Sequence, residues 1–278
     1  MKKRSKPMMY KILRLVVAGS KKHEFLNRHW ISWLFKIVPR SFRETLALHL
    51  LSLSPHYFIY QWDSCYPANL KHREILYREN SRNIISRKAI CNSILKDYLH
   101  SNDVVLDFGC GPGYLAREVS KYVSKVLATD VSAGTIACAR ELNLEDNIQY
   151  MTNSNLGLGK ISDSSIDFIY SFAVFQHLEK KQTKVFLKEF TRILKPQGRA
   201  LVHLIINDKI SEEKANPNIK SYVKWYRARV RLRMVYYGYD EIKKLLMDSG
   251  FKEIRITKVE GSKVDDDVGK QHMAIFRK

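Results

Sequence analysis

Residues 104–114 read VVLDFGCGPGY, and they are the most informative part of the chain about its fold. Its first five residues are typical of a short buried strand, and a run with helical spacing of apolar residues follows at 114–122. Gly109, Gly111 and Gly113 lie between the two. Glycines allow a tight turn and a close approach of the backbone to a ligand. Because ligands of open α/β sheets bind at the carboxyl ends of the strands, we expect a ligand-binding loop here.

Strands and helices alternate on both sides of this loop. The predicted strands are 104–108, 125–130, 147–151, 166–171 and 199–206, and the predicted helices are 80–100, 114–122, 132 onward and 185–194. This alternation predicts a parallel sheet with helices on both faces.

The C-terminal part departs from that pattern. A helix at 240–247 precedes two strand-like runs, 252–259 and 271–277, and the loop between them is too short for a helical crossover. We therefore expect an antiparallel hairpin at one end of the sheet. The predicted fold is α/β: a Rossmann-like, doubly wound, mostly parallel seven-stranded sheet with this hairpin, plus an N-terminal helical extension.

The chain has 278 residues and a formal net charge of +20, and 45% of its residues are hydrophobic. That apolar content excludes disorder as a description of the whole chain. Residues 1–50 hold 12 Lys or Arg and two acids, which is half of the charge excess. Such asymmetry predicts an anionic partner: nucleic acid, an acidic membrane surface or an acidic substrate. The four cysteines form no C-x-x-C pair, so we expect no metal site and a reducing, cytoplasmic compartment.

The N-terminal residues allow two interpretations. Lys11 and Arg14 interrupt the apolar part of a signal-like start, and the uncharged stretch 45–62 is too polar for a good transmembrane helix. Short amphipathic segments remain, with an apolar side and a basic side. The apolar side is expected to hold Trp30, Trp33, Phe35 and Ile37. It either packs on the main domain or lies in the plane of an anionic membrane, which would make the protein peripheral on that membrane through residues 1–50.

Two residues discriminate between classes of cofactor. Residues 111–116 also satisfy the G-x-G-x-x-A form of the dinucleotide fingerprint. However, the carboxylate of Asp107 repels a pyrophosphate and attracts an ammonium or sulfonium, and Pro112 removes a backbone N–H that a phosphate would use. Asp130 ends the second strand, where an acid accepts hydrogen bonds from ribose hydroxyls. The pattern therefore favours a cofactor with a ribose and a positive charge but no phosphate.

At this point the chain resembles the class I S-adenosylmethionine-dependent methyltransferases over about residues 85–278. Residues 104–114 are similar to motif I of that family, and 195–198 (KPQG) are similar to its K-P-G-G turn, with Gln197 in place of a glycine. The resemblance implies S-adenosylmethionine as cofactor, with Asn153 at a position that contacts adenine and is often Asp in relatives. The cofactor-binding residues it implies are Asp107, Phe108, Gly109, Cys110, Gly111, Gly113, Asp130, Val131, Asn153 and Ser171.

The segment after the fourth strand bears on the methyl acceptor. Residues 171–178 read SFAVFQHL, without the acidic/Asn-Pro-Pro-aromatic motif of relatives that methylate planar amino groups. No Pro-Cys pair indicates covalent attack on a pyrimidine. The segment looks more like the small-molecule, glycan and lipid methyltransferases of the family. His177 is the candidate catalytic base, because its ordinary pKa suits a proton transfer near neutrality; the alternative is that it only fixes the loop.

A basic run at 214–233 follows the fifth strand, within a segment (207–239) expected to form a lid over the acceptor site. An extended backbone would aim its alternating arginines to one side, where they could bind phosphate or carboxylate. A solvated basic face is the alternative. The substrate-binding candidates are Tyr226, Arg227, Arg229, Arg231 and Arg233.

The sequence thus predicts a basic helical extension at 1–80 and a methyltransferase domain at 81–278. The expected reaction is methyl transfer to an oxygen or nitrogen nucleophile on a small-molecule, glycan-linked or lipid-linked, acidic acceptor. Basic and aromatic residues also describe RNA binding, so an RNA methyltransferase is the first alternative. A protein acceptor also stays open. The second alternative is an NAD(P)-binding or non-catalytic cofactor-binding module, since fold does not fix function.

Overall fold

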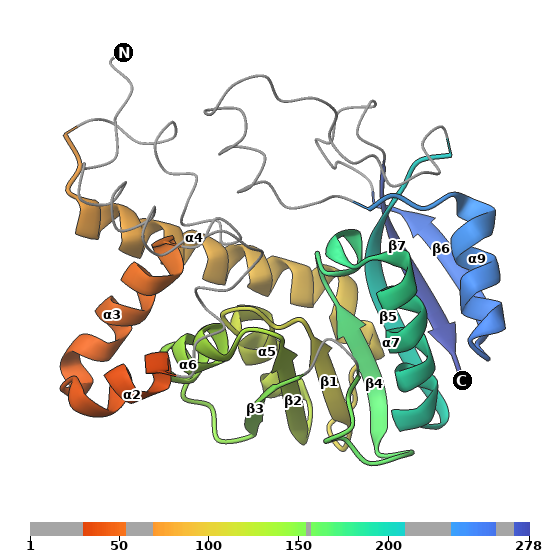
Figure 1. The fold of residues 1–278 in the computed structure, drawn as a ribbon, viewed down its shortest axis with the longest axis horizontal. Coiled ribbons are helices and arrows are strands. Elements are labelled where there is room, and N and C mark those ends of the chain that lie inside the picture. Colours follow the sequence, from red (N-terminus) through yellow and green to blue (C-terminus); the bar gives the residue numbers. More distant parts are fainter. Residues whose placement is uncertain (1–29, 54–68, 154–156, 209–234, 260–269) are drawn as a thin grey trace.

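A computed structural model describes residues 30–53, 69–153, 157–208, 235–259 and 270–278 (Figure 1). The described elements are α2 (Trp30–Ile37), α3 (Arg40–Leu53), α4 (His72–Ile90), the π-helical turn η2 (Cys91–Leu95), η3 (Lys96–Tyr98), β1 (Val104–Phe108), α5 (Tyr114–Val119), η4 (Ser120–Tyr122), β2 (Lys125–Asp130), α6 (Ala133–Leu142), β3 (Ile148–Thr152), β4 (Ile166–Ser171), η5 (Phe175–His177), α7 (Lys180–Ile193), β5 (Leu194–Ile206), α9 (Tyr239–Asp248), β6 (Lys252–Lys258) and β7 (Lys270–Arg277).

The seven strands form one sheet in the order β3-β2-β1-β4-β5-β7-β6. β1 to β5 are parallel, whereas β7 is antiparallel to both β5 and β6. The predicted Rossmann-like sheet with a closing antiparallel hairpin is therefore confirmed. The strand order reverses between β1 and β4, and this switch point is where α/β sheets place their ligands. The glycine loop at 109–113 follows β1 directly, so it lies at the switch point.

Helices cover both faces of the sheet. On one face, a core cluster joins Phe186 and Phe190 of α7 and Leu246 of α9 to the strands. On the other face, a second cluster joins Leu95 of η2 and Leu115 of α5 to the strands. Figure 1 shows α7 and α9 beside β5 to β7, and α5 and α6 beside β1 to β3. A parallel sheet buried on both faces explains why its strands read as nearly continuous apolar runs.

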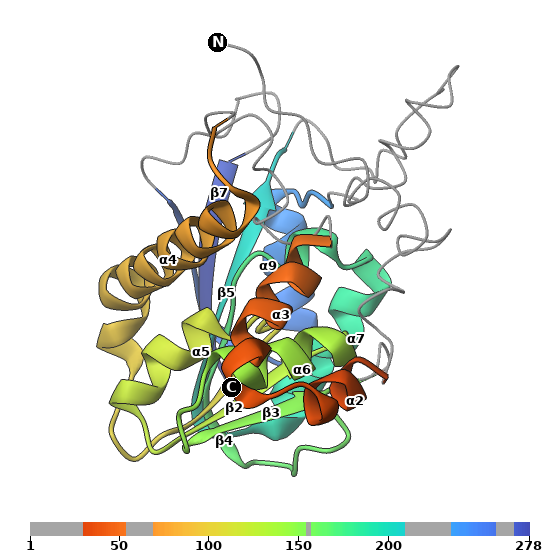
Figure 2. The same cartoon turned by 90° about the vertical axis from the view of Figure 1, so that its left-hand side faces the viewer.

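The N-terminal helices α2 and α3 pack on α6 (Figure 2). Ile31, Phe35 and Leu48 are buried against Ala137 and Cys138 of α6. The prediction that Phe35 shares a side with Trp30, Trp33 and Ile37 is wrong. Phe35 is only 3% exposed, because it lies one helical turn after buried Ile31 and therefore on the inner face.

The ends of several elements differ from the predicted ones. The helix predicted at 80–100 begins at His72 and continues past residue 80. The domain boundary predicted at residue 80 stays a prediction. The helix predicted to begin at residue 185 begins at Lys180, because Glu179 and Gln182 form a capping box. In it, the amide oxygen of the Gln182 side chain accepts a hydrogen bond from the Glu179 N–H at 3.0 Å. Among the described helices, none combines the length and the apolar character that crossing a bilayer requires.

Candidate functional site

The glycine loop turns sharply from β1 into α5. The amide groups of Gly109 and Cys110 both donate to the carbonyl of Thr129 on β2, at 2.8 and 2.9 Å. Gly109 has φ +77°, and a Cβ there would lie 2.2 Å from Cγ2 of Val174, which follows β4. A side chain at this position is excluded twice, by backbone conformation and by space. The loop is therefore packed closely between the ends of β2 and β4.

Asp107 is the acid at the end of β1. Its side chain is 2% exposed, and its Oδ2 atom is buried without a hydrogen-bond partner among the described residues. Burial raises the pKa of Asp107 to about 7, and the nearby Asp130 carboxylate adds to this, while the Tyr170 hydroxyl and Arg87 oppose it. A buried acceptor oxygen without a donor is costly in the isolated protein. Such an atom marks a place where a ligand's donor or cation would fit.

Asp130 holds the other side of the loop. Its Oδ2 accepts the N–H of Gly111 at 3.1 Å, and its Oδ1 accepts the N–H of Ser132 at 2.9 Å. Burial is the main cause that raises the pKa of Asp130, and these two N–H groups partly oppose it. A carboxylate offers about four lone-pair sites, so both oxygens retain capacity for further donors such as hydroxyls. The N–H of Asn153 donates to the carbonyl of Asp130 at 3.1 Å, which brings the end of β3 to the same place.

These residues fit one class of cofactor and not the other. Two carboxylates at a single glycine loop, one buried and one half-buried, repel a pyrophosphate, which a dinucleotide would have to place there. They match a ligand that brings a cation to Asp107 and hydroxyls to Asp130. S-adenosylmethionine carries a sulfonium, an ammonium and a ribose diol, and no phosphate. The residues that the structure brings together therefore fit this group.

Arg87 is a residue of this site that the sequence reasoning missed. It lies on α4, and burial lowers its pKa, while Asp107 and the Tyr114 hydroxyl oppose this effect. Asn80 lies on the same helix, and its Oδ1 accepts from the Tyr114 hydroxyl at 2.5 Å, which ties α4 to the start of α5. The sequence signal was a row of polar residues at helical spacing (Asn80, Asn83, Arg87) on the side of α4 that also carries buried Leu76.

Three other predicted cofactor residues have side chains that serve the fold. The Phe108 ring packs against Phe186 and Phe190, at centroid distances of 4.7 and 5.2 Å, on the α7 side of the sheet. The Ser171 hydroxyl donates to the carbonyl of Phe108 at 2.9 Å and links β4 to β1. Cys110 is buried, which raises its pKa well above the usual thiol value. A contribution of these residues to the cofactor would come from their backbone. Val131 is half-buried beside Asp130.

The loop after β4 is held by a histidine that the sequence reasoning also missed. His203 of β5 is 8% exposed, and its Nδ1 accepts the N–H of Ala173 at 3.3 Å. Its ring is parallel to that of Phe172, with centroids 6.0 Å apart. Burial lowers the pKa of His203, and the positive charges of Arg87 and two other histidines add to this, so the ring is neutral at pH 7. Because Nδ1 accepts, the proton of this neutral ring is on Nε2.

His203 thus stabilises an unusual backbone conformation. Ala173 has φ +59°, which is strained for a residue with a side chain. In the sequence, His203 stands inside the run ALVHLII and is easily taken for a core residue of a strand. The only sequence signal of its role was the presence of one titratable side chain near the carboxyl end of a predicted strand.

His177, the predicted base, ends the short helix η5 after β4. It is half-buried, and its Nε2 lies 3.2 Å from the amide nitrogen of Gln176. It is close enough to His203 for its charge to affect the pKa of that residue. The structure therefore puts His177, His203 and Arg87 in one electrostatic neighbourhood at the carboxyl ends of β1, β4 and β5. Its role as a base stays a prediction.

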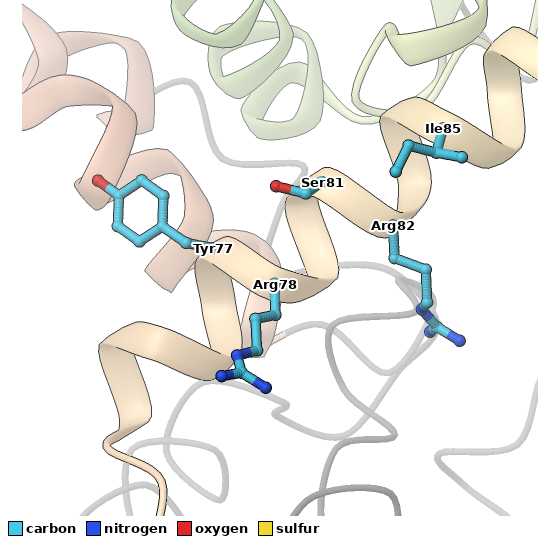
Figure 3. Close-up of a pocket in the computed structure, with 5 residues that line it drawn as sticks. All are labelled: Tyr77, Arg78, Ser81, Arg82 and Ile85. Carbon is cyan, nitrogen blue, oxygen red and sulfur yellow. The ribbon is translucent and has the colours of Figure 1, made fainter.

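The predicted substrate-binding residues lie outside the described part of the chain. They are Tyr226, Arg227, Arg229, Arg231 and Arg233, and with them most of the predicted lid at 207–239. A cavity of about 440 Å³ lies along α4, and residues between Tyr77 and Ile85 line it (Figure 3). Figure 3 shows the guanidinium groups of Arg78 and Arg82 pointing to the same side of that helix. This cavity contains none of the predicted site residues.

Comparisons with known proteins agree with this geometry. Residues 106–202, from β1 into β5, match the family model of a methyltransferase domain. The malonyl-acyl carrier protein O-methyltransferase of Priestia megaterium is 30% identical over 129 residues, which are 44% of this chain and 44% of that protein. A ribosomal protein methyltransferase of Listeria welshimeri is 32% identical over 124 residues, 43% of this chain and 38% of that protein.

A solved structure has the same fold. The S-adenosylmethionine-dependent methyltransferase of Mesorhizobium loti aligns with a TM-score of 0.51 and 17% identity, over 64% of this chain and 92% of that one. The chain spans less than half the length of the two curated relatives. The shared part holds the glycine loop, Asp130 and the loop after β4, while Arg87 and His203 lie outside the family match.

Proposed function

We propose that this protein is a class I S-adenosylmethionine-dependent methyltransferase, which the methyltransferase domain matched at residues 106–202 supports. We propose further that it methylates an oxygen or nitrogen nucleophile on an acidic small-molecule, glycan-linked or lipid-linked acceptor. The observation that carries the cofactor assignment is the pair of acids on the two sides of the glycine loop, buried Asp107 and half-buried Asp130. S-adenosylmethionine, when bound, supplies a methyl carbon activated by its sulfonium.

The residues of the chain then have distinct tasks toward this cofactor. The ionised Asp107 binds its ammonium group, and Arg87 binds its carboxylate. Asp130 accepts hydrogen bonds from the ribose hydroxyls, and Asn153 binds adenine. Each pairing matches opposite charges, or a donor with an acceptor, at groups that are buried or half-buried. The closed packing of Gly109 against Val174 keeps the loop in one conformation and lowers the entropic cost of binding.

Methyl transfer depends mainly on the orientation of the acceptor, with a base needed where the acceptor must lose a proton. His203 fixes Ala173, which positions the loop that carries His177. We assign the proton transfer to His177, because both nitrogens of neutral His203 are committed: Nδ1 accepts from Ala173, and the other ring nitrogen carries the proton that faces Gln271. His203 is thus a positioning residue.

The acceptor class rests on three observations. The loop after β4 lacks the motif of relatives that methylate planar amino groups, and the basic run at 214–233 suits phosphate or carboxylate. The relative from Priestia megaterium is named for an O-methylation on an acidic acyl group, and this supports an acidic acceptor. The relative from Listeria is named for a protein acceptor, so the matched region alone does not select the acceptor.

The test is to incubate the full chain with methyl-labelled S-adenosylmethionine and cell extract, and to separate lipid, small polar, RNA and protein fractions. Asp107→Asn is the control that weakens cofactor binding. Label that enters a lipid or an anionic small molecule only with the unaltered chain supports the proposal. Label in RNA or protein overturns the acceptor class. No transfer and no cofactor binding overturn the function itself.

A further inference from the structure

The short helix α2 is apolar on two opposite faces. Ile31 and Phe35, spaced by four residues, are 0% and 3% exposed and pack on α6. Trp30, Trp33 and Ile37 have the spacing of the opposite face and are 45%, 57% and 57% exposed. A helix that only covers a domain needs one apolar stripe, and its other face is ordinarily polar. The second apolar face of α2 is therefore not explained by the packing of this chain.

A fourth exposed apolar side chain extends that face. Phe42, in the first turn of α3, is 63% exposed and follows Ile37 across a short turn. Figure 2 shows α2 and the start of α3 together at the outside of the molecule, beside α6. We call Trp30, Trp33, Ile37 and Phe42 the aromatic patch. Clustered exposed apolar side chains on a soluble domain mark an interaction site more often than scattered ones do.

The charged side chains of α2 and of the first turn of α3 are positive, and exposed Glu44 follows in the next turn. Lys36 and Arg40 are exposed, and within the described part of the chain neither makes an ion pair. Arg43 pairs with Glu141 of α6 at 3.7 Å and belongs to the inner packing instead. In the sequence, residues 1–29 directly before the patch hold nine Lys or Arg and only Glu24 as an acid. Bulky apolar groups with a cationic border thus form the outer surface of this region.

We propose that the aromatic patch docks on an anionic lipid bilayer, with Trp30, Trp33, Ile37 and Phe42 at the level of the headgroups and Lys36 and Arg40 against their phosphates. Tryptophan prefers the interface between membrane and water, because its ring is apolar and its N–H is polar. Cations next to such a helix are attracted by the negative surface potential of anionic lipids. A nucleic acid fits less well, because Ile37 cannot stack on bases and provides no charge for phosphates.

This docking surface is coupled to the cofactor end by rigid packing. α6, on which α2 and α3 lie, begins after Ser132, whose N–H is bound by Asp130. The patch itself shares no residue with the cofactor site. The proposal therefore does not depend on the proposed reaction, and each can fail without the other.

The test uses the full chain and two kinds of vesicle, one of phosphatidylcholine alone and one with about a third phosphatidylglycerol. Co-sedimentation and a blue shift of tryptophan fluorescence report docking. We expect binding to the anionic vesicles that Trp33→Ser with Phe42→Ser weakens roughly tenfold or more. Lys36→Gln with Arg40→Gln should weaken binding to anionic vesicles and leave any binding to neutral ones unchanged.

Met247→Ser is the matched control, because Met247 is 59% exposed on α9, at the other end of the sheet. It should bind vesicles as the unaltered chain does. Because the substituted side chains are exposed, all variants should keep the melting temperature of the parent. No vesicle binding, or binding that the patch variants leave intact, overturns the proposal. It is equally overturned where the patch variants abolish RNA binding or self-association and leave vesicle binding unchanged.

Discussion

Replacing Asp107 with asparagine should stabilise the protein at pH 8 while it weakens binding of the cofactor. In the folded chain the pKa of Asp107 is about 7, against an ordinary value of 3.8 that applies to the unfolded chain. Between these two values the folded state keeps a proton that the unfolded state has released. The contribution of Asp107 to stability therefore falls as the pH rises from 4 to 7, and the loss is complete above 7.

The size of the effect follows from the two pKa values. Each pKa unit corresponds to about 1.4 kcal/mol, so the ionised Asp107 costs at most about 4 kcal/mol of unfolding free energy at pH 8. About 3 kcal/mol of this develops between pH 5 and pH 8. Asparagine has a similar shape and no charge, so it avoids this cost. For a chain of this size, the gain in melting temperature should grow by roughly 5–10 °C over that pH range.

The assay is thermal unfolding of the parent and of Asp107→Asn at pH 5, 6, 7 and 8 without cofactor. Asp97→Asn is the control, because Asp97 is an exposed aspartate of η3. Its difference from the parent should be the same at every pH. The reasoning fails if the difference in melting temperature between Asp107→Asn and the parent does not grow with pH. Ionised Asp107 would then not destabilise the folded chain.

Three further predictions concern the same region. Affinity for S-adenosylmethionine should rise up to about tenfold per pH unit below pH 7 and level off above pH 7, because only the ionised Asp107 attracts an ammonium. Calorimetry at several pH values checks this dependence, and an affinity that does not change with pH would contradict it. Gly109→Ala should cost about 2 kcal/mol or more of unfolding free energy, because Gly109 has a φ of +77° and a Cβ would collide with Val174. In denaturant unfolding, adding Val174→Ala should restore only part of that loss. An alanine variant as stable as the parent would contradict the loop geometry. His203→Leu should lower kcat by roughly tenfold or more and leave the affinity for S-adenosylmethionine unchanged. His203→Asn should recover part of that rate, because asparagine keeps an acceptor for the Ala173 N–H. Equal rates of the leucine and asparagine variants would count against a positioning role.

The sequence is sufficient to predict the parts of the fold that depend on local patterns. The strand 104–108, the glycine loop and Asp130 follow one another within a short stretch, so spacing and residue type determine their arrangement. The antiparallel hairpin was predictable because its connection is too short for a crossover. Asn153 came from a family pattern, and the structure brings its backbone to Asp130.

Other parts depend on contacts between distant residues, and no local pattern reports them. Phe35 was assigned to the wrong face because α2 is apolar on both faces, so its composition does not tell which face is buried. His203 meets Ala173 across 30 residues and two strands, and the charge of Arg87 acts on Asp107 only because α4 packs on α5. Such residues are found only when the elements are arranged in space.

The most direct test of the central claim is a calorimetric titration of the full chain at pH 8 with S-adenosylmethionine and, separately, with NAD. We expect saturable binding of one S-adenosylmethionine per chain, at least tenfold weaker with Asp107→Asn, and no binding of NAD. Binding of NAD without binding of S-adenosylmethionine would contradict this expectation, because two acids at the glycine loop would then hold a pyrophosphate.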